Sequence, residues 1–156
     1  MITLPEGLKT LLKDKNAIKV LGTVDGDGAP HVVFKDSIAL LEDGNLAYAE
    51  ELDSSQANKN MVRGIWFDKL VSITVGKGKK SYQVKARPVK CAIVGPVFRE
   101  FLSRAKEQRG ADADVQSVWI ITPIDCRDQS REVRLEEERE KDPYYNIHLD
   151  RLRVEK

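Results

Sequence analysis

Short apolar runs separated by polar turns recur along most of this sequence, a pattern typical of β-strands joined by hairpins. The residues at 25–28 and at 43–45 have the Asp-Gly composition of tight turns between such strands. Pro88 lies inside the longest run, where proline favours an edge strand or a bulge. We expect strands at residues 17–24, 31–34, 37–41, 46–50, 70–75, 81–94 and 115–124.

Other segments have the spacing of helices, with apolar residues three or four positions apart. Leu8, Leu11 and Leu12 share one face of the first such segment, so we expect this helix to cap the end of a barrel. The last segment carries almost only charged residues and is expected to be a solvated helix, with pairs such as Arg134 with Glu138. The predicted helices span residues 5–14, 53–66, 97–109 and 130–141.

Six to seven short strands with helices only at the edges predict a mainly β protein, an antiparallel β-barrel with a few capping helices. We expect residues 1–126 to form this barrel domain. Residues 127–156 are expected to add the charged helix and a C-terminal tail. Apolar positions alternate over 147–154, so we expect this tail to pack on the barrel or on a partner subunit.

Charge and hydropathy exclude several classes of protein. The chain has 156 residues and a net charge of +1, from 26 basic and 25 acidic side chains. This balance argues against a general nucleic-acid binder or a membrane-surface binder. No segment approaches the ~20 apolar residues of a membrane span, and residues 1–12 do not have the pattern of a signal peptide.

The cysteines and histidines indicate a reduced compartment and no metal. Cys91 and Cys126 lie far apart in apolar surroundings, and we interpret them as buried thiols in preference to a disulfide. The two cysteines and two histidines have no metal-ligand spacing. We therefore expect a cytoplasmic protein without a structural metal.

The polar stretch between the fourth strand and the following helix is the first candidate site. Asp53, Ser54 and Ser55 open a short helix that carries Lys59 and Asn60. Hydroxyl groups at a helix start satisfy free N–H groups, and the same helix end attracts anions, phosphate above all. The stretch is therefore either a phosphate seat or an ordinary N-cap followed by a solvated helix.

A second candidate is the pair of charges between the second and third strands. Lys35 and Asp36 interrupt an apolar run. Charges at such a place mark a bulge or a ligand-facing edge, or else a solvated kink. The residues alone leave both interpretations open.

The order of these elements resembles that of the flavin-mononucleotide (FMN)-binding split barrels, the pyridoxamine 5'-phosphate oxidase-like family. Its small single-domain members are the most similar in pattern. The resemblance covers roughly residues 4–124 and is carried by the order and spacing of four segments. These segments are DGAPHVVFKDSIALL (27–41), DGNLAYAEELDSSQANKN (43–60), KLVSITV (69–75) and YQVKARPVKC (82–91).

The resemblance implies that FMN lies in a groove between the two barrels of a homodimer, with its phosphate at the turn before the short helix. It implies that the ring and ribityl chain lie along Phe34, Lys35, Asp36 and Ser37. The phosphate seat implied in the same way consists of Ser54, Ser55, Gln56, Ala57, Lys59 and Asn60.

This chain departs from the family at that seat. A Lys-Thr pair common in the family falls on Gln56-Ala57, and Glu50-Glu51 lie just upstream, where carboxylates disfavour a phosphate. Lys59, Lys35 or Arg63 would compensate, because one cation at about 4 Å contributes several kcal/mol at moderate effective dielectric, before desolvation.

Three hypotheses for function follow from this resemblance. The first is an FMN-dependent oxidoreductase acting on an unknown small molecule, in which no side chain is identified as catalytic. The second is a non-enzymatic flavin carrier or electron-transfer protein. The third is a split-barrel binding module without a cofactor. A deazaflavin in the same groove is an alternative to FMN.

Overall fold

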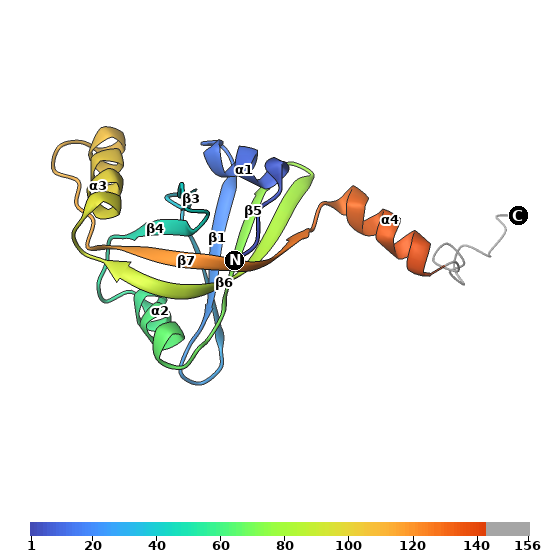
Figure 1. Ribbon diagram of the computed structural model, residues 1–156, viewed down its shortest axis with the longest axis horizontal. Helices are drawn as coiled ribbons and strands as arrows, with labels where there is room; N and C mark the ends of the chain where they lie inside the picture. The colour runs from blue at the N-terminus through green and yellow to red at the C-terminus, as the bar shows by residue number, and fades with distance from the viewer. Residues whose placement is uncertain (143–156) are drawn as a thin grey trace, which may run out of the picture.

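The computed structural model describes residues 1–142, which form one curled sheet of seven antiparallel strands with helices around it (Figure 1). The strand order is β2-β1-β5-β6-β7-β4-β3, so β2 and β3 are the two edges. The predicted antiparallel barrel with edge helices is confirmed. The strands are β1 (Ile18–Val24), β2 (Pro30–Phe34), β3 (Ala39–Leu40), β4 (Leu46–Glu50), β5 (Val71–Lys77), β6 (Lys80–Ala92) and β7 (Ser117–Asp128).

Two strands differ from their expected forms. β3 pairs with β4 at only two positions, because the preceding residues form a turn and the Ser37 side chain bonds to Ala49 of β4. β6 lies inside the sheet, and the register of its pairing with β7 shifts between Pro88 and Lys90. Of the two alternatives predicted for Pro88, the edge strand is therefore wrong and the bulge is confirmed, and this bulge lets a proline lie in an inner strand.

One hydrophobic core fills the barrel. Alternate residues of the strands point inward, such as Leu21, Ile73 and Val84, all fully buried. Helix α1 (Glu6–Lys13) buries its three leucines against this core at one end of the barrel. The predicted capping helix is therefore confirmed.

A second core lies on the other face of β4. Helix α3 (Pro96–Arg109) packs Phe101 and Ala105 against Ala47 and Ala49. Tyr48, between these alanines, points into the barrel core instead. β4 is therefore buried on both faces, and its five residues are all buried.

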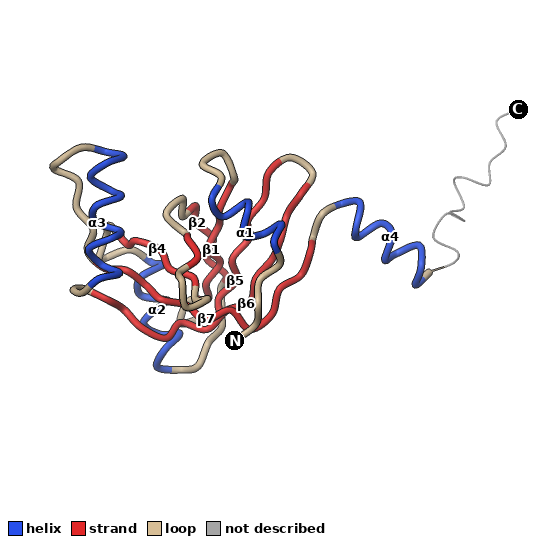
Figure 2. Tube along the Cα trace, turned by 45° about the horizontal axis from the view of Figure 1, so that its top comes forward, coloured by secondary structure: helices blue, strands red, loops and turns tan. Residues whose placement is uncertain are grey.

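Helix α2 (Gln56–Trp66) covers the barrel end opposite α1 (Figures 1 and 2). It buries Ala57, Asn60 and Met61 on its inner face. Gly64 allows a close approach to β6, since a Cβ atom there would lie 2.9 Å from Pro88 Cγ. The helix thus has a fixed position against the sheet, with its start beside the end of β4.

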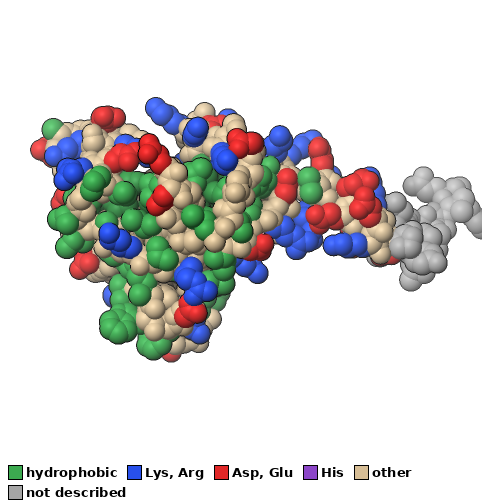
Figure 3. Space-filling view, in the orientation of Figure 1, with side chains coloured by type: hydrophobic (Ala, Val, Ile, Leu, Met, Phe, Trp, Pro, Cys, Tyr) green, Lys and Arg blue, Asp and Glu red, His purple; other side chains and the backbone are tan. Residues whose placement is uncertain are grey.

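Helix α4 (Arg131–Lys141) extends away from the barrel in both views and has no buried residue (Figures 1 and 2). Acidic and basic side chains cover it, as Figure 3 shows. Arg134 pairs with Glu137, the residue before the predicted partner Glu138. The predicted packing of the 147–154 tail lies outside the described residues.

The cysteines correct one expectation and agree with another. Cys126 is half-buried and Cys91 is exposed, so the interpretation of both as buried thiols was wrong. Cys91 lies at the bulge in β6. Residues 89–91 are all exposed there, so the in–out alternation of the strand is lost. Both cysteines are free, as expected. Among residues 1–142, no helix is both long enough and apolar enough to cross a membrane.

Candidate functional site

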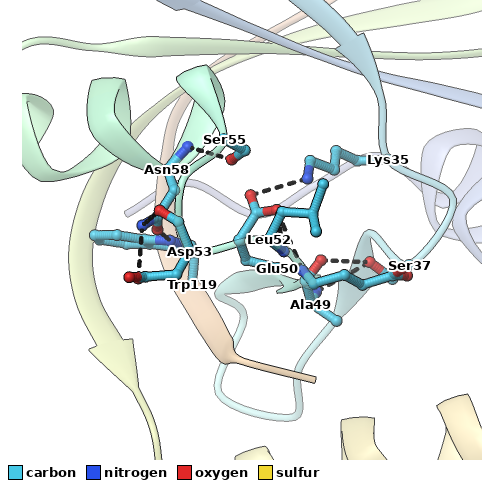
Figure 4. A network of polar contacts seen from close by, with 10 residues as sticks. Lys35, Ser37, Ala49, Glu50, Leu52, Asp53, Ser55, Asn58 and Trp119 are labelled. Atoms are coloured by element: carbon cyan, nitrogen blue, oxygen red, sulfur yellow. Dashed lines mark hydrogen bonds and ion pairs between the residues drawn. The ribbon is translucent and has the colours of Figure 1, made fainter. Parts of the chain in front are cut away.

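A network of polar contacts connects the end of β2, the end of β4 and the start of α2 (Figure 4). We call the segment after β4 the β4–α2 turn, residues 50–58. Its contacts come from elements that are far apart in the sequence. The chain order and the sheet topology bring them together, because residues 35–38 lead from β2 into β3, the neighbour of β4, and α2 follows β4 after a short turn.

Lys35 and Glu50 form an ion pair at the centre of this network. Lys35 Nζ lies 2.9 Å from Glu50 Oε2, and the Glu50 side chain is only 2% exposed. The same ammonium lies 5.1 Å from the centre of the Tyr48 ring. The next residue, Asp36, is exposed. The two charged residues that follow β2 therefore differ, since Lys35 is directed into the network and Asp36 is solvated.

The second carboxylate oxygen of Glu50 binds the main chain of the β4–α2 turn. Glu50 Oε1 accepts the N–H groups of Glu51 at 3.2 Å and of Leu52 at 3.3 Å. Each oxygen of this buried carboxylate thus has donors of its own. Sequence reasoning treated Glu50 only as an unfavourable charge and missed this arrangement, whose one signal is a lysine and a glutamate placed at the ends of two apolar strands.

Tyr48 contributes a buried hydroxyl without a hydrogen-bond partner in the part of the chain that the structure describes. Burial, with the negative charge of Glu50 as a further cause, raises the pKa of Tyr48 well above its ordinary value. The hydroxyl therefore remains protonated at physiological pH.

Ser37 extends the hydrogen bonding of β4 just before β3 begins. Its Oγ accepts the N–H of Ala49 at 2.9 Å and lies 3.5 Å from the Ala49 carbonyl oxygen. The neighbouring Phe34 lies on the outer side of β2, with 74% of its surface exposed. Of the four residues predicted to line the ring, Lys35 and Ser37 thus join the network, whereas Phe34 and Asp36 face solvent.

Ser55 is the N-cap of α2, and its Oγ accepts the Asn58 N–H at 3.0 Å. The Asn58 side chain donates to the Asp53 carbonyl oxygen at 2.8 Å and accepts the Trp119 indole N–H at 2.9 Å. Asn58 therefore fastens the turn to β7. Trp119 is buried, and neither its indole bond nor the role of Asn58 follows from the sequence pattern.

The rest of the predicted phosphate seat divides between the barrel interior and solvent. Asn60 is buried, donates to Thr23 Oγ1 at 2.9 Å and accepts from Gln56 Nε2 at 2.8 Å. Its amide therefore faces the barrel, as does the buried Ala57. Ser54 and Lys59 are exposed.

The turn matches a phosphate group through its hydroxyl and N–H groups but not through a cation. The N–H groups of Gln56 and Ala57 have no hydrogen-bond partner within residues 1–142. They lie in the first turn of α2, beside the hydroxyls of Ser54 and Ser55. Such free donors at a helix start attract phosphate.

The charges around the turn are less favourable. Glu51 is paired with Arg109 at 2.7 Å, whereas within residues 1–142 the Asp53 carboxylate has only a 3.4 Å contact with the Asn58 amide. The ammonium of Lys35 is occupied by Glu50. Within residues 1–142, no group of three or more acidic, histidine or cysteine side chains is placed to hold a metal ion.

Solved structures with the same architecture are similar to this chain over most of its length. HupZ of Group A Streptococcus matches with a TM-score of 0.67 at 18% identity, over 83% of this chain and 96% of HupZ. A candidate pyridoxamine 5'-phosphate oxidase from Lactobacillus delbrueckii matches with a TM-score of 0.63 at 22% identity, over 80% and 93% of the two chains. An FMN-binding protein from Syntrophomonas wolfei matches with a TM-score of 0.66 at 12% identity, over 78% and 83%.

No protein-family model and no curated protein matches the sequence. The structural likenesses establish the fold of the chain, which is the split barrel of pyridoxamine 5'-phosphate oxidase-like proteins. The resemblance drawn from the order of the sequence segments is thereby confirmed for the fold.

Proposed function

We propose that this split barrel binds a flavin nucleotide, FMN in the first place, and acts as a flavin-dependent oxidoreductase on a small molecule. The observation that supports this proposal most directly is the β4–α2 turn. Free N–H groups and two serines lie there at a helix start, in a fold shared with an FMN-binding protein.

In the proposed complex, hydroxyl and main-chain N–H groups of the turn hold the phosphate directly, and no positively charged side chain contacts it. Ser54 and Ser55 donate hydroxyl hydrogens, and Gln56 and Ala57 donate main-chain N–H groups, at the positive end of the α2 dipole. Lys59, exposed in the first turns of α2, adds charge from the solvent side. When bound, the flavin supplies hydride and electron transfer, and the chain orients the ring.

The proposal includes a homodimer in which the ring lies along residues 34–37 and contacts the second barrel. Val32 and Phe34 support it, because both are large apolar side chains exposed on the outer side of β2. The free thiols of Cys91 and Cys126 support a location in the reduced cytoplasm. Light scattering at micromolar concentration tests the dimer, and a monomeric mass would contradict it.

Titration with FMN and with riboflavin, followed by flavin fluorescence, tests the phosphate seat. Riboflavin lacks the phosphate, and charge-assisted hydrogen bonds contribute roughly 1.5–3 kcal/mol each, so FMN should bind at least about tenfold more tightly. Ser54→Ala and Lys59→Ala should narrow this difference. Ser103→Ala, an exposed serine of α3, is the matched control and should leave it unchanged.

The two other hypotheses remain as outcomes of these measurements. Equal affinity for FMN and riboflavin would reject the phosphate seat. If neither flavin nor a deazaflavin binds, the protein is a cofactor-free binding module. The Lys35–Glu50 pair favours this alternative, because it occupies the cation beside the turn. If flavin binds but a reduced nicotinamide does not reduce it in the presence of varied acceptors, a carrier or electron-transfer role is favoured over an oxidoreductase.

A further inference from the structure

Glu50 is the most deeply buried charged side chain near the proposed phosphate seat. Carboxylates are rarely this buried unless they are paired, because removing the charge from water is costly. The surroundings of Glu50 provide that pairing completely. Lys35 binds one oxygen, and two successive main-chain N–H groups bind the other.

The groups around this carboxylate have the composition of an oxyanion seat. An ammonium and successive main-chain N–H groups are the donors with which proteins bind phosphate, sulfate and carboxylate ligands. The distances of 2.9, 3.2 and 3.3 Å are those of an anion bound by three donors. Here the anion is part of the chain itself.

Stability alone is a weak explanation for this arrangement. The attraction within a buried ion pair is largely offset by the desolvation of both charges, and well-packed apolar residues at such places are often equally stable. The pair instead has a consequence for ligands. It occupies Lys35 and two N–H groups directly beside the turn in which this chain has Gln56-Ala57, without a cation.

We propose that Glu50 is an internal anion that fills an oxyanion seat made by Lys35 and the N–H groups of Glu51 and Leu52, and that it thereby determines which ligands bind beside the β4–α2 turn. With this seat filled, a ligand can place only a neutral polar group near Lys35. A ligand phosphate is left to the start of α2. The effect on flavin choice rests on the proposed function, whereas the seat itself does not.

The experiment removes the internal anion and offers an external one. Thermal unfolding of the wild type and of Glu50→Ala is followed in inorganic phosphate, with sodium chloride at matched ionic strength as the reference. The wild type should respond little to phosphate. Glu50→Ala should be stabilised in a saturable manner, with an affinity for phosphate at least about tenfold higher than that of the wild type.

The double variant Lys35→Met/Glu50→Ala is the matched control, because it lacks both the internal anion and the cation that would hold its replacement. It should lose the phosphate response. A response in this double variant equal to that in Glu50→Ala would overturn the assignment of the seat to Lys35. Equal responses of Glu50→Ala and the wild type would overturn the proposal as a whole.

Glu50→Gln provides a second measurement if the alanine variant is too unstable. Glutamine keeps the shape and an acceptor for the N–H groups but releases the charge of Lys35. It should increase the ratio of FMN to riboflavin affinity, and an unchanged ratio together with no phosphate response would reject the proposal. If neither the wild type nor Glu50→Gln binds flavin but Glu50→Ala binds phosphate, the proposed function fails while the oxyanion seat stands.

Discussion

The two ends of the barrel are closed in chemically different ways. At one end, α1 buries three leucines in the core. At the other end, α2 buries an amide, Asn60, which bonds to Thr23 of β1 and to Gln56. Strand β1 passes through both environments, with Lys19 near α1 and Thr23 near α2.

This difference explains why the candidate site lies at the α2 end. Apolar packing is not directional, so the leucines of α1 allow small adjustments of the helix. A buried hydrogen-bonded amide fixes both position and rotation, because any shift leaves costly unpaired groups. The Asn60 contacts therefore hold α2 so that its first turn is directed at the end of β4.

Leu8→Ala should give the largest loss of stability at the apolar end. Leu8 is fully buried, and deleting its side chain leaves a cavity that typically lowers the free energy of unfolding by about 2–5 kcal/mol. Urea unfolding measures this effect, with the exposed Lys13→Ala as control. Flavin affinity should stay unchanged, and a parallel loss of affinity would show that the two ends are not independent.

Asn60→Leu should have a smaller effect, which depends on its partner. The substitution leaves the Thr23 hydroxyl buried and unpaired, at a cost of about 1–3 kcal/mol. Adding Thr23→Val removes the unpaired hydroxyl and should recover part of this loss, so that the effects are not additive. Strictly additive losses would contradict the role of the hydrogen bond at this end.

Replacing Lys19 should give the smallest effect, a change in how stability depends on pH. Its Nζ donates to the Leu12 carbonyl oxygen at 2.8 Å, at the end of α1. Burial lowers its pKa below the ordinary value of 10.5, partly opposed by the charge of Asp36. In the window between the lowered pKa and 10.5, the unfolded chain binds more protons, so stability rises with pH.

The matched comparison is Lys19→Met, which has no charge to titrate. Urea unfolding from neutral pH to pH 10.5 should move the free-energy difference between the two proteins in favour of the wild type as pH rises. Parallel pH profiles would show that the ammonium is as well solvated in the folded chain as in the unfolded chain.

Local sequence signals predicted the parts of the fold that depend on neighbouring residues. The bounds of β4, the leucine face of α1 and the bulge at Pro88 all follow from periodicity or from a single proline. Ser55 was expected at a helix start because its hydroxyl can accept a free N–H group there, and it caps α2.

The site was less predictable because its contacts join distant residues. Lys35 and Glu50 are 15 positions apart, and Asn58 and Trp119 are 61 apart. No periodicity connects such pairs until the strand order is known. The contacts of Asn60 were hidden for a related reason, since its position after the turn does not show that the helix directs its amide to Thr23, 37 positions away.

The short third strand has a consequence for the behaviour of the protein at high concentration. An unpaired strand edge is a template for a strand of another chain, and from there for aggregation. β3 covers only two residues of β4, but Ser37 binds the Ala49 N–H and Glu50 binds those of Glu51 and Leu52. A foreign strand would find these donors occupied, so the side chains of the polar network also protect this edge of the sheet against pairing with another chain.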